Sequence, residues 1–254
     1  MAFPATVGIT GANGRIGRVL VEGLRDLCEV RPITRREVND LPSTVVDLHD
    51  VEAATRAFEG LEAVIHLAAD PSPRSGWVSV RENNIDMTFQ VFEACRIAGV
   101  RRMVFASTNH TQHGNTILET PETLDTSKNI RMKLTDLPNP DSLYAVSKVF
   151  GETLGKYYSE RHGLEFISLR IGWLIAENDP TRMVGKSSED YMRAMFLSHR
   201  DCVEAHRRAL DVDTKFMLAY AVSNNDRRVF DLTDTIETLG FTPQDNAENY
   251  FEKL

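Results

Sequence analysis

The sequence predicts an α/β protein in which helices cover both faces of a mainly parallel β-sheet. Three observations lead to this fold class. Short apolar segments alternate with amphipathic ones, the 254 residues suit one large domain, and a glycine-rich turn joins the first apolar segment to the first amphipathic one. Parallel strands joined by helical crossovers are buried on both faces, so their sequences read as continuous apolar runs.

The apolar and amphipathic segments alternate through the first two-thirds of the chain. In the first amphipathic segment, Ile16, Val19, Leu20 and Leu24 share one helical face. The expected helices lie at 15–27, at 51–58, in a long segment that ends near Gly99, and at 143–162 before Gly163. The expected strands lie at 6–10, 30–34, 44–46, 63–67, 103–107 and 166–170.

Two segments interrupt this alternation. Residues 110–142 are polar and rich in proline, and loops of this length in a compact domain are usually functional or disordered. Residues 176–189 are also irregular. They precede a helix expected to begin at Ser198-His-Arg-Asp201, where Ser198 and Asp201 have the spacing of a capping box. A strand near 216–222 and a short helix that ends at Gly240 follow.

The glycine-rich turn has the sequence Gly11-Ala-Asn-Gly14-Arg-Ile-Gly17. Gly11 would allow a tight turn, Gly14 a close approach of backbone to a pyrophosphate, and Gly17 close packing of helix and strand. The alternative is a turn without a ligand, which its place in a β-α-β unit disfavours. The motif predicts a Rossmann-type doubly wound sheet. The expected phosphate contacts are Gly11, Asn13, Gly14, Arg15, Ile16 and Gly17, with helix N–H groups as donors.

The end of the second strand bears on the choice between NAD and NADP. NAD sites usually carry an acid there, which binds the ribose hydroxyls, but this strand ends at Thr34 and continues with Arg35 and Arg36. An arginine can pair with a 2′-phosphate, which favours NADP, although both arginines could equally be solvated loop charges. Asp47 and Leu48 are expected beside the adenine, unless Asp47 instead caps the helix that follows.

Tyr144 and Lys148 lie four residues apart in the expected helix 143–162, so they share one face. A phenol with its ordinary pKa near ~10 is too weak a base at neutral pH, but a neighbouring ammonium should lower that pKa. Tyr144 could then accept a proton from a substrate hydroxyl. Such a pair is common on helix surfaces. Its place after a strand that ends at Ser107-Thr108 favours a catalytic role, because either hydroxyl could bind the reacting oxygen.

Composition excludes several function classes. The 29 basic and 37 acidic side chains give a formal net charge of −8, which disfavours nucleic acid and anionic membranes as partners. No apolar stretch suits a membrane span or a signal peptide, so we expect a soluble, cytoplasmic protein. Cys28, Cys95 and Cys202 are widely separated and suit neither disulfides nor zinc, so no metal site is expected.

Three segments together resemble the extended short-chain dehydrogenase/reductase family, which includes the NAD-dependent epimerases and dehydratases. They are the glycine turn, His66-Leu-Ala-Ala69, and Tyr144 to Lys148. Within that family the chain is similar to the uronate dehydrogenases and to archaeal sugar and glucose-6-phosphate dehydrogenases. The resembling segments include Phe105-Ala-Ser-Thr-Asn-His110 and Phe196-Leu-Ser-His-Arg-Asp-Cys202.

The resemblance implies a role for individual residues. Thr108 would be the hydroxyl partner of Tyr144, with Ser107 beside it, and Asn84 would lie near the nicotinamide. Arg182 falls on an arginine that binds the uronate carboxylate in similar enzymes, and Trp173 stands where they carry a small polar residue. Asn109 and His110 would bind sugar hydroxyls. The remaining expected cofactor contacts are Leu67, Ala68, Ala69, Tyr144, Lys148 and Ile171.

The implied activity is NAD(P)-dependent oxidation of a cyclic sugar at C1 to a lactone, the sugar being a hexuronate, a hexose or a hexose phosphate. Residues 1–172 would mainly form the dinucleotide-binding domain, residues 173–254 a small substrate-binding portion, and two long helices a homodimer. One alternative is a sugar-nucleotide epimerase or dehydratase, which the short C-terminal portion disfavours. Another is a non-catalytic dinucleotide sensor, which the presence of Tyr144, Lys148 and Thr108 disfavours.

Overall fold

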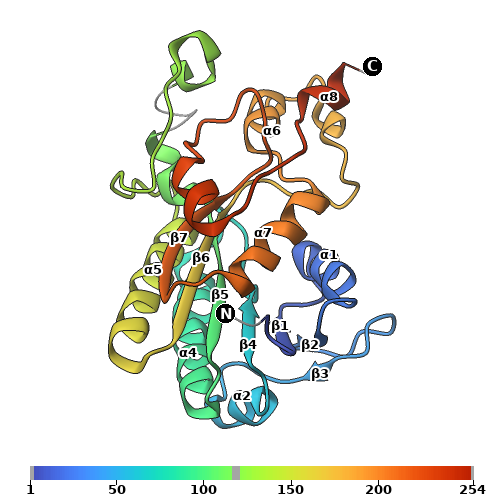
Figure 1. Cartoon of the computed structure of the whole chain (residues 1–254), viewed down its shortest axis with the longest axis vertical. Helices are drawn as coiled ribbons and strands as arrows, with labels where there is room; N and C mark the ends of the chain where they lie inside the picture. The colour runs from blue at the N-terminus through green and yellow to red at the C-terminus, as the bar shows by residue number, and fades with distance from the viewer. Residues whose placement is uncertain (1–2, 116–120, 253–254) are drawn as a thin grey trace.

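Within residues 3–115 and 121–252, which the computed structural model describes, seven strands form one sheet in the order β3-β2-β1-β4-β5-β6-β7 (Figure 1). Every neighbouring pair is parallel. The chain builds outward from β1 in one direction and then from β4 in the other. The order therefore reverses between β1 and β4, which is where open α/β sheets bind their ligands.

All the expected strands are present, and each boundary lies within one residue of its expected position. The buried central strands differ little in length from their apolar runs because both faces of the sheet are covered. The strands are β1 Thr6–Thr10, β2 Glu29–Thr34, β3 Thr44–Val45, β4 Ala63–His66, β5 Arg102–Thr108, β6 Glu165–Ile171 and β7 Phe216–Ala221.

The helices differ more from expectation. The first ends three residues early, because Leu27 is half exposed and adds nothing to the core. The expected long helix is divided into three parts by a π-helical segment, Arg81–Asp86. Two short helices, α6 and α8, were not expected. The helices are α1 Arg15–Leu24, α2 Val51–Phe58, α3 Trp77–Val80, α4 Met87–Ala98, α5 Leu143–His162, α6 Glu189–Met195, α7 His199–Asp211 and α8 Glu248–Phe251.

Each face of the sheet has its own apolar core. On one face, α1 and α7 contribute Leu20 and Ala205; on the other, α2, α4 and α5 contribute Phe58, Phe92 and Tyr158 (Figure 1). The described part of the C-terminal portion, residues 173–252, takes part in this layering, since β7 extends the sheet and α7 covers it. Among the described residues, no helix is both long and apolar enough to cross a membrane.

Two glycines set the distance between α5 and the sheet. A Cβ atom on Gly151 would lie 2.3 Å from the ring of Phe105, and one on Gly155 would lie 2.2 Å from the ring of Phe166. These distances are far below van der Waals contact, so only glycine allows the helix to pack this closely on β5 and β6. The close packing holds the N-terminal half of α5 beside the end of β5.

The expected capping box at α7 is only half formed. The Ser198 hydroxyl does accept a hydrogen bond from the amide of Asp201, at 3.1 Å. The Asp201 carboxylate does not return to the amide of Ser198. It accepts hydrogen bonds from the Ser223 hydroxyl at 2.7 Å and from the amides of Gln244 and Asp245, each at 3.0 Å. Asp201 therefore anchors the C-terminal segment to α7.

Candidate active site

The glycine turn lies at the carboxyl end of β1, directly beside the end of β4. Gly11 has φ +68°, and a Cβ atom there would lie 2.8 Å from the backbone nitrogen of Ala68. The Thr10 hydroxyl accepts hydrogen bonds from the amides of Leu67 at 3.2 Å and Ala68 at 3.3 Å. The same hydroxyl lies 2.8 Å from Nδ1 of buried His66. Burial and the charge of Lys148 lower the pKa of His66 to about 3.

The start of α1 fits the pyrophosphate of a dinucleotide. Gly14 is the N-cap residue, no side chain caps the first amides of the helix, and the first turn carries no acidic residue. A phosphate is the ligand that such free N–H groups favour. Asn13 accepts two hydrogen bonds from Arg18, which also pairs with Asp40 at 2.8 Å and was not anticipated. This bridge links the turn to the loop after β2.

The loop after β2 is arranged differently from a typical NAD site. The buried Thr34 hydroxyl donates to the carbonyl of Arg36 at 2.8 Å and lies 2.8 Å from the Ser43 hydroxyl, whereas Arg35 is exposed. Asp47 does not cap α2, because Asp50 accepts the capping hydrogen bonds. Hydrogen bonds from His49, with a smaller contribution from Arg35, lower the pKa of the Asp47 carboxyl.

Three predicted side chains meet where β5 ends and α5 begins. Thr108 is the last residue of β5, and its hydroxyl lies near enough to the Tyr144 phenol to lower the pKa of that phenol. Buried Lys148 extends its Nζ to 5.7 Å from the centre of the Tyr144 ring and 4.9 Å from that of Phe105. Ile171, at the end of β6, is the register partner of Thr108. A phenol, an ammonium group and a hydroxyl thus converge at the carboxyl edge of the sheet.

The expected lowering of the Tyr144 pKa is wrong for the protein by itself. Burial raises the pKa of Tyr144 to about 12; the Thr108 hydroxyl opposes this rise, and the carboxylates of Asp141 and Asp70 add to it. Burial also lowers the pKa of Lys148 to about 8, so the lysine still carries its charge at pH 7. Desolvation of the partly buried Tyr144 therefore outweighs the favourable effect of the Thr108 hydroxyl on the phenolate.

Asn84 lies in the π-helical segment and is fully enclosed. Its Oδ1 accepts a hydrogen bond from the amide of Asp70 at 2.7 Å, and its Nδ2 donates to the carbonyl of Asp70 at 3.0 Å and to the Ser147 hydroxyl at 3.1 Å. Asn84 therefore joins the loop after β4 to α5. Local widening of a helix into π geometry is frequent at functional sites. Sequence reasoning missed Asp70, although it directly follows the Ala68-Ala69 segment.

The Ser107 side chain is hydrogen-bonded inside the protein. Its hydroxyl donates to Glu152 at 2.7 Å, and Glu152 forms a buried, bidentate pair with Arg170 at 2.9 Å. The single hydrogen of the Ser107 hydroxyl thus points toward α5. Of the two strand-end hydroxyls, Thr108 is the one that acts on the Tyr144 phenol.

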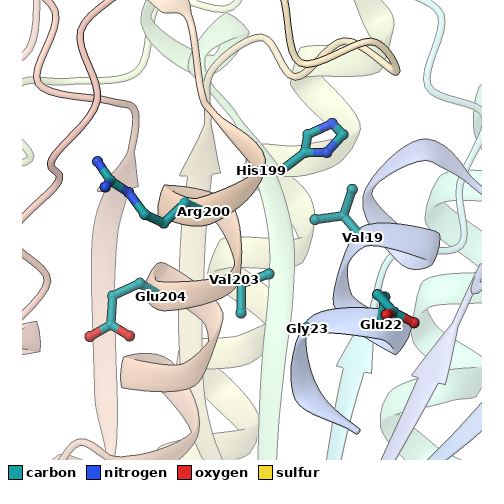
Figure 2. A pocket seen from close by; sticks show the side chains of 7 residues that line it. All are labelled: Val19, Glu22, Gly23, His199, Arg200, Val203 and Glu204. Atoms are coloured by element: carbon teal, nitrogen blue, oxygen red, sulfur yellow. The ribbon is translucent and has the colours of Figure 1, made fainter.

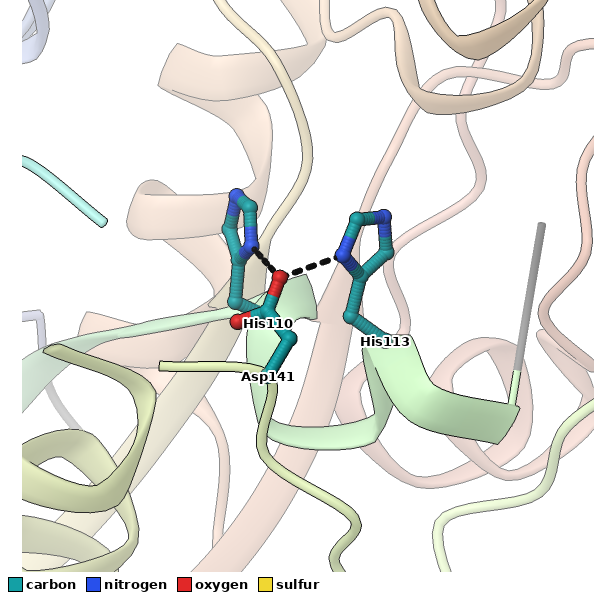
Figure 3. Close-up of side chains that lie close together, drawn as sticks. All are labelled: His110, His113 and Asp141. Atoms are coloured by element: carbon teal, nitrogen blue, oxygen red, sulfur yellow. Dashed lines mark hydrogen bonds and ion pairs between the residues drawn. The ribbon is translucent and has the colours of Figure 1, made fainter. Parts of the chain in front are cut away.

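A cluster of two histidines and a carboxylate lies beside Tyr144 (Figure 3). The Oδ2 atom of Asp141 lies 2.8 Å from Nδ1 of His110 and 2.5 Å from Nδ1 of His113. The ligand-type atoms of the three lie within 4.8 Å of one another, which could suit a metal. These two separations are hydrogen-bond lengths, however, and are shorter than the about 3.3 Å between ligands of a tetrahedral zinc ion.

The same cluster borders an aromatic wall. Nδ2 of Asn109 donates a hydrogen bond to the Tyr191 hydroxyl. The Tyr191 ring lies 5.1 Å from the His113 ring and 5.5 Å from the Trp173 ring, between centres. Sequence reasoning missed His113, Asp141 and Tyr191. The His-x-x-His spacing and an aspartate just before α5 were the available signals.

Within the described residues, the Arg182 side chain forms no hydrogen bond or ion pair with this cluster. Arg182 is an exposed residue of the 3-10 turn Pro180–Met183. Over residues 3–115 and 121–252, no ion pair or hydrogen bond of its side chain is formed. The expected contact with a substrate carboxylate therefore stays a prediction.

A separate pocket of about 440 Å³ lies between α1 and α7 (Figure 2). Val19 and Glu22 line one side, and His199 and Val203 line the other. None of the residues predicted for cofactor or substrate lines it. It is a groove between two packed helices, and the candidate active site is the carboxyl edge of the sheet.

Fold and site together define a dinucleotide-binding enzyme of the short-chain dehydrogenase/reductase type. A glycine turn lies at the strand-order reversal, with a Tyr144–Lys148 pair and a strand-end threonine at the same edge. Residues 7–213 match the model of the NAD dependent epimerase/dehydratase family, and the chain belongs to that family.

Three relatives are similar to this chain over most of its length. An L-arabinose 1-dehydrogenase (NAD(P)(+)) of Haloferax volcanii is 43% identical over 98% of this chain and 100% of its own. An NAD-dependent glucose-6-phosphate dehydrogenase of the same organism is 36% identical over 95% of this chain and 94% of its own. A uronate dehydrogenase of Pseudomonas syringae is 31% identical over 97% of this chain and 84% of its own.

Solved structures of similar dehydrogenases have the same fold. A glucuronic acid dehydrogenase from Chromohalobacter salexigens superposes with a TM-score of 0.82 at 27% identity, over 98% of this chain and 88% of that one. A mutant uronate dehydrogenase from Agrobacterium tumefaciens, complexed with NAD, has a TM-score of 0.80 at 26% identity, over the same shares of the two chains. These similarities confirm the predicted fold class and family resemblance.

Proposed function

We propose that this protein is an NAD(P)-dependent sugar dehydrogenase that oxidises a cyclic sugar at C1 to a lactone. The observation that carries the proposal is the convergence of Tyr144, Lys148 and Thr108 at the carboxyl edge of the sheet, beside the glycine turn. Full-length similarity to relatives named as sugar dehydrogenases supports it.

Each of these residues would have its own role in the reaction. Bound NAD(P)⁺ supplies the hydride acceptor and a positive charge that favours the phenolate. Thr108 orients the C1 hydroxyl of the sugar, and Oη of Tyr144 accepts its proton as the C1–H bond breaks. Lys148 provides a buried cation beside the phenol, which lowers the cost of its negative charge. The backbone amides of the glycine turn hold the pyrophosphate.

Asn84 and Asp141 would act as positioning residues in this scheme. Asn84 holds the loop after β4 against α5 through Asp70 and Ser147. Asp141 receives the Nδ1–H groups of both histidines, which leaves Nε2 of His110 as a hydrogen-bond acceptor. Figure 3 shows this Nε2 atom pointing away from the carboxylate. An acceptor there suits a sugar hydroxyl, the role that we propose for His110.

A cofactor and sugar panel tests the function. We expect absorbance of reduced nicotinamide to grow when the protein is mixed with an aldose and either NAD⁺ or NADP⁺. We expect kcat/KM with NADP⁺ to equal or exceed that with NAD⁺, because exposed Arg35 can reach a 2′-phosphate and no acid ends β2. Sugar-nucleotide isomerisation without net reduction would instead indicate an epimerase, and cofactor binding without either reaction would indicate a sensor.

We also propose a homodimer, supported by apolar stripes on two adjacent helices. Phe89 and Ile97 on α4 are 43% and 53% exposed, and Val146 and Tyr157 on α5 are 46% and 53% exposed. Within each helix the two residues recur at helical spacing, so each pair forms a stripe on one side. Sedimentation velocity should give twice the monomer mass, and Val146→Glu should shift the protein to monomer. A monomeric wild-type protein would contradict this.

A further inference from the structure

The charged side chains around Tyr144 differ from those expected of a site for an acidic sugar. The two carboxylates that act on the phenol, Asp70 and Asp141, come from the loop after β4 and from the residue that precedes Ser142, the N-cap of α5. Both are held in place by hydrogen bonds: Asp70 by the hydroxyls of Ser75 and Ser79, and Asp141 by its two histidines. The negative charge is therefore fixed at the site rather than free to turn away.

Both carboxylates stay ionised at neutral pH. Burial raises the pKa of Asp141, but hydrogen bonds from His110 and His113 outweigh it and hold that pKa well below its usual value. Burial likewise raises the pKa of Asp70, and the hydroxyls of Ser75 and Ser79 more than offset it. Two permanent negative charges in a partly enclosed site repel a third, because screening there is weaker than in bulk water.

Neither Lys148 nor Arg182 is held where it could neutralise an anionic substrate. Lys148 is buried under the rings of Phe105 and Tyr144, and the proposed reaction already uses its charge. Arg182, the expected carboxylate ligand, is itself exposed and has no side-chain partner within the described ranges. A guanidinium that binds carboxylate tightly is usually held in place by its neighbours.

One wall of the site is aromatic. Tyr191 stands between Trp173 and His113, and its hydroxyl is held by the side-chain amide of Asn109. The Asn109 amide is thus partly occupied before any sugar binds. Aromatic rings pack well on the C–H face of a neutral sugar ring and offer no partner for a carboxylate or phosphate.

From the two fixed carboxylates and the aromatic wall we infer that the site selects an uncharged aldose over uronates and sugar phosphates, with Asp141 as the main discriminating residue. The inference deepens the proposed sugar dehydrogenase function and depends on it. It also chooses among the three substrate classes that the names of the relatives offer, namely a neutral pentose, a hexose phosphate and a uronate.

Three sugars test the inference directly. L-Arabinose, D-galactose and D-galacturonate share the ring configuration at C2 to C4 and differ at C5, which carries H, CH₂OH or COO⁻. We expect kcat/KM for both neutral sugars to exceed that for D-galacturonate by about tenfold or more. D-Glucose and D-glucose 6-phosphate provide a second pair, for which we expect the same order.

Two variants that each remove one negative charge test whether Asp141 causes the preference for neutral sugars. In Asp141→Asn the ratio of kcat/KM for D-galactose to that for D-galacturonate should fall by about fivefold, because a fixed negative charge is removed. The control, Asp190→Asn, removes the same charge from an exposed side chain on α6 that pairs with Arg227 at 3.1 Å. Its ratio should stay within about twofold of wild type, since exposed charges are screened.

The outcomes separate the two proposals. If no sugar reduces either cofactor, the dehydrogenase function fails and this inference fails with it. If D-galacturonate or D-glucose 6-phosphate is the preferred substrate of the wild-type protein, the dehydrogenase function stands and the inference is overturned. A ratio unchanged in Asp141→Asn, or a D-galacturonate rate lost in Arg182→Ala, also overturns it. If Asp141→Asn does not fold, the wild-type ranking and the Arg182→Ala rates decide the question.

Discussion

Replacing Tyr144 with phenylalanine should lower kcat by about 10²- to 10⁴-fold, the usual contribution of a positioned proton acceptor. The ring and its contacts stay, so only the hydroxyl near Thr108 is lost. Cofactor affinity, measured by fluorescence titration, should change by no more than about threefold, because the glycine turn and Lys148 are untouched. Steady-state rates with a saturating neutral sugar measure the effect.

A matched control lies on the same helix. Tyr157→Phe removes a phenol that is 53% exposed and whose ring contacts Tyr158 and His162, remote in sequence from the catalytic turn of α5. Its kcat should stay within about twofold of wild type. If Tyr144→Phe kept more than a third of the wild-type kcat, Tyr144 would not be the proton acceptor, and the proposed mechanism would be wrong.

Replacing Glu152 with glutamine should destabilise the protein by about 3–5 kcal/mol, because it leaves the Arg170 cation buried without a counter-charge. The two side chains are 6% and 2% exposed and form two hydrogen bonds of 2.9 Å. For a protein of this size the loss corresponds to a fall in melting temperature of roughly 10 °C, measured by calorimetry. The hydroxyl of Ser107, which donates to Glu152, would lose its charged acceptor as well.

The comparison for this variant is Glu160→Gln on the exposed end of α5. Glu160 pairs with Lys156 at 4.0 Å, and both side chains are 61% exposed. Solvent-exposed pairs of this kind contribute about 0–1 kcal/mol, so its melting temperature should hardly change. Equal melting temperatures for Glu152→Gln and wild type would show that the buried pair contributes little to stability.

Local patterns in the sequence were enough to predict the elements of the fold. Each strand lies within one residue of an apolar run, and α2 and α5 begin and end where the pattern places them. Strands and helices depend on residues near one another in the chain, and Gly163 ends α5 in the left-handed conformation, at φ +73°. The π-helical segment at Arg81–Asp86 was not predictable, because it depends on the contacts of Asn84 with Asp70 and Ser147.

Some residues of the candidate site were also predictable from local sequence, and others were not. Tyr144 and Lys148 were predictable because helical spacing places them on one face, and Thr108 because it ends a buried strand. Ser107 could not be separated from Thr108 by sequence, since its partner Glu152 is 45 residues away. The same holds for Asp141, which meets His113 across 28 residues and His110 across 31.

The sequence by itself determined the class of fold and the position of the glycine turn, and it predicted the tyrosine, lysine and threonine of the candidate site. These follow from periodicity and from residue types at short spacing, which act locally. Only the tertiary structure decided the electrostatics: the Tyr144 pKa rises rather than falls, and two carboxylates contribute to that rise. Burial and long-range contacts determine these properties, because the dielectric around a charge depends on what packs against it rather than on its neighbours in the chain.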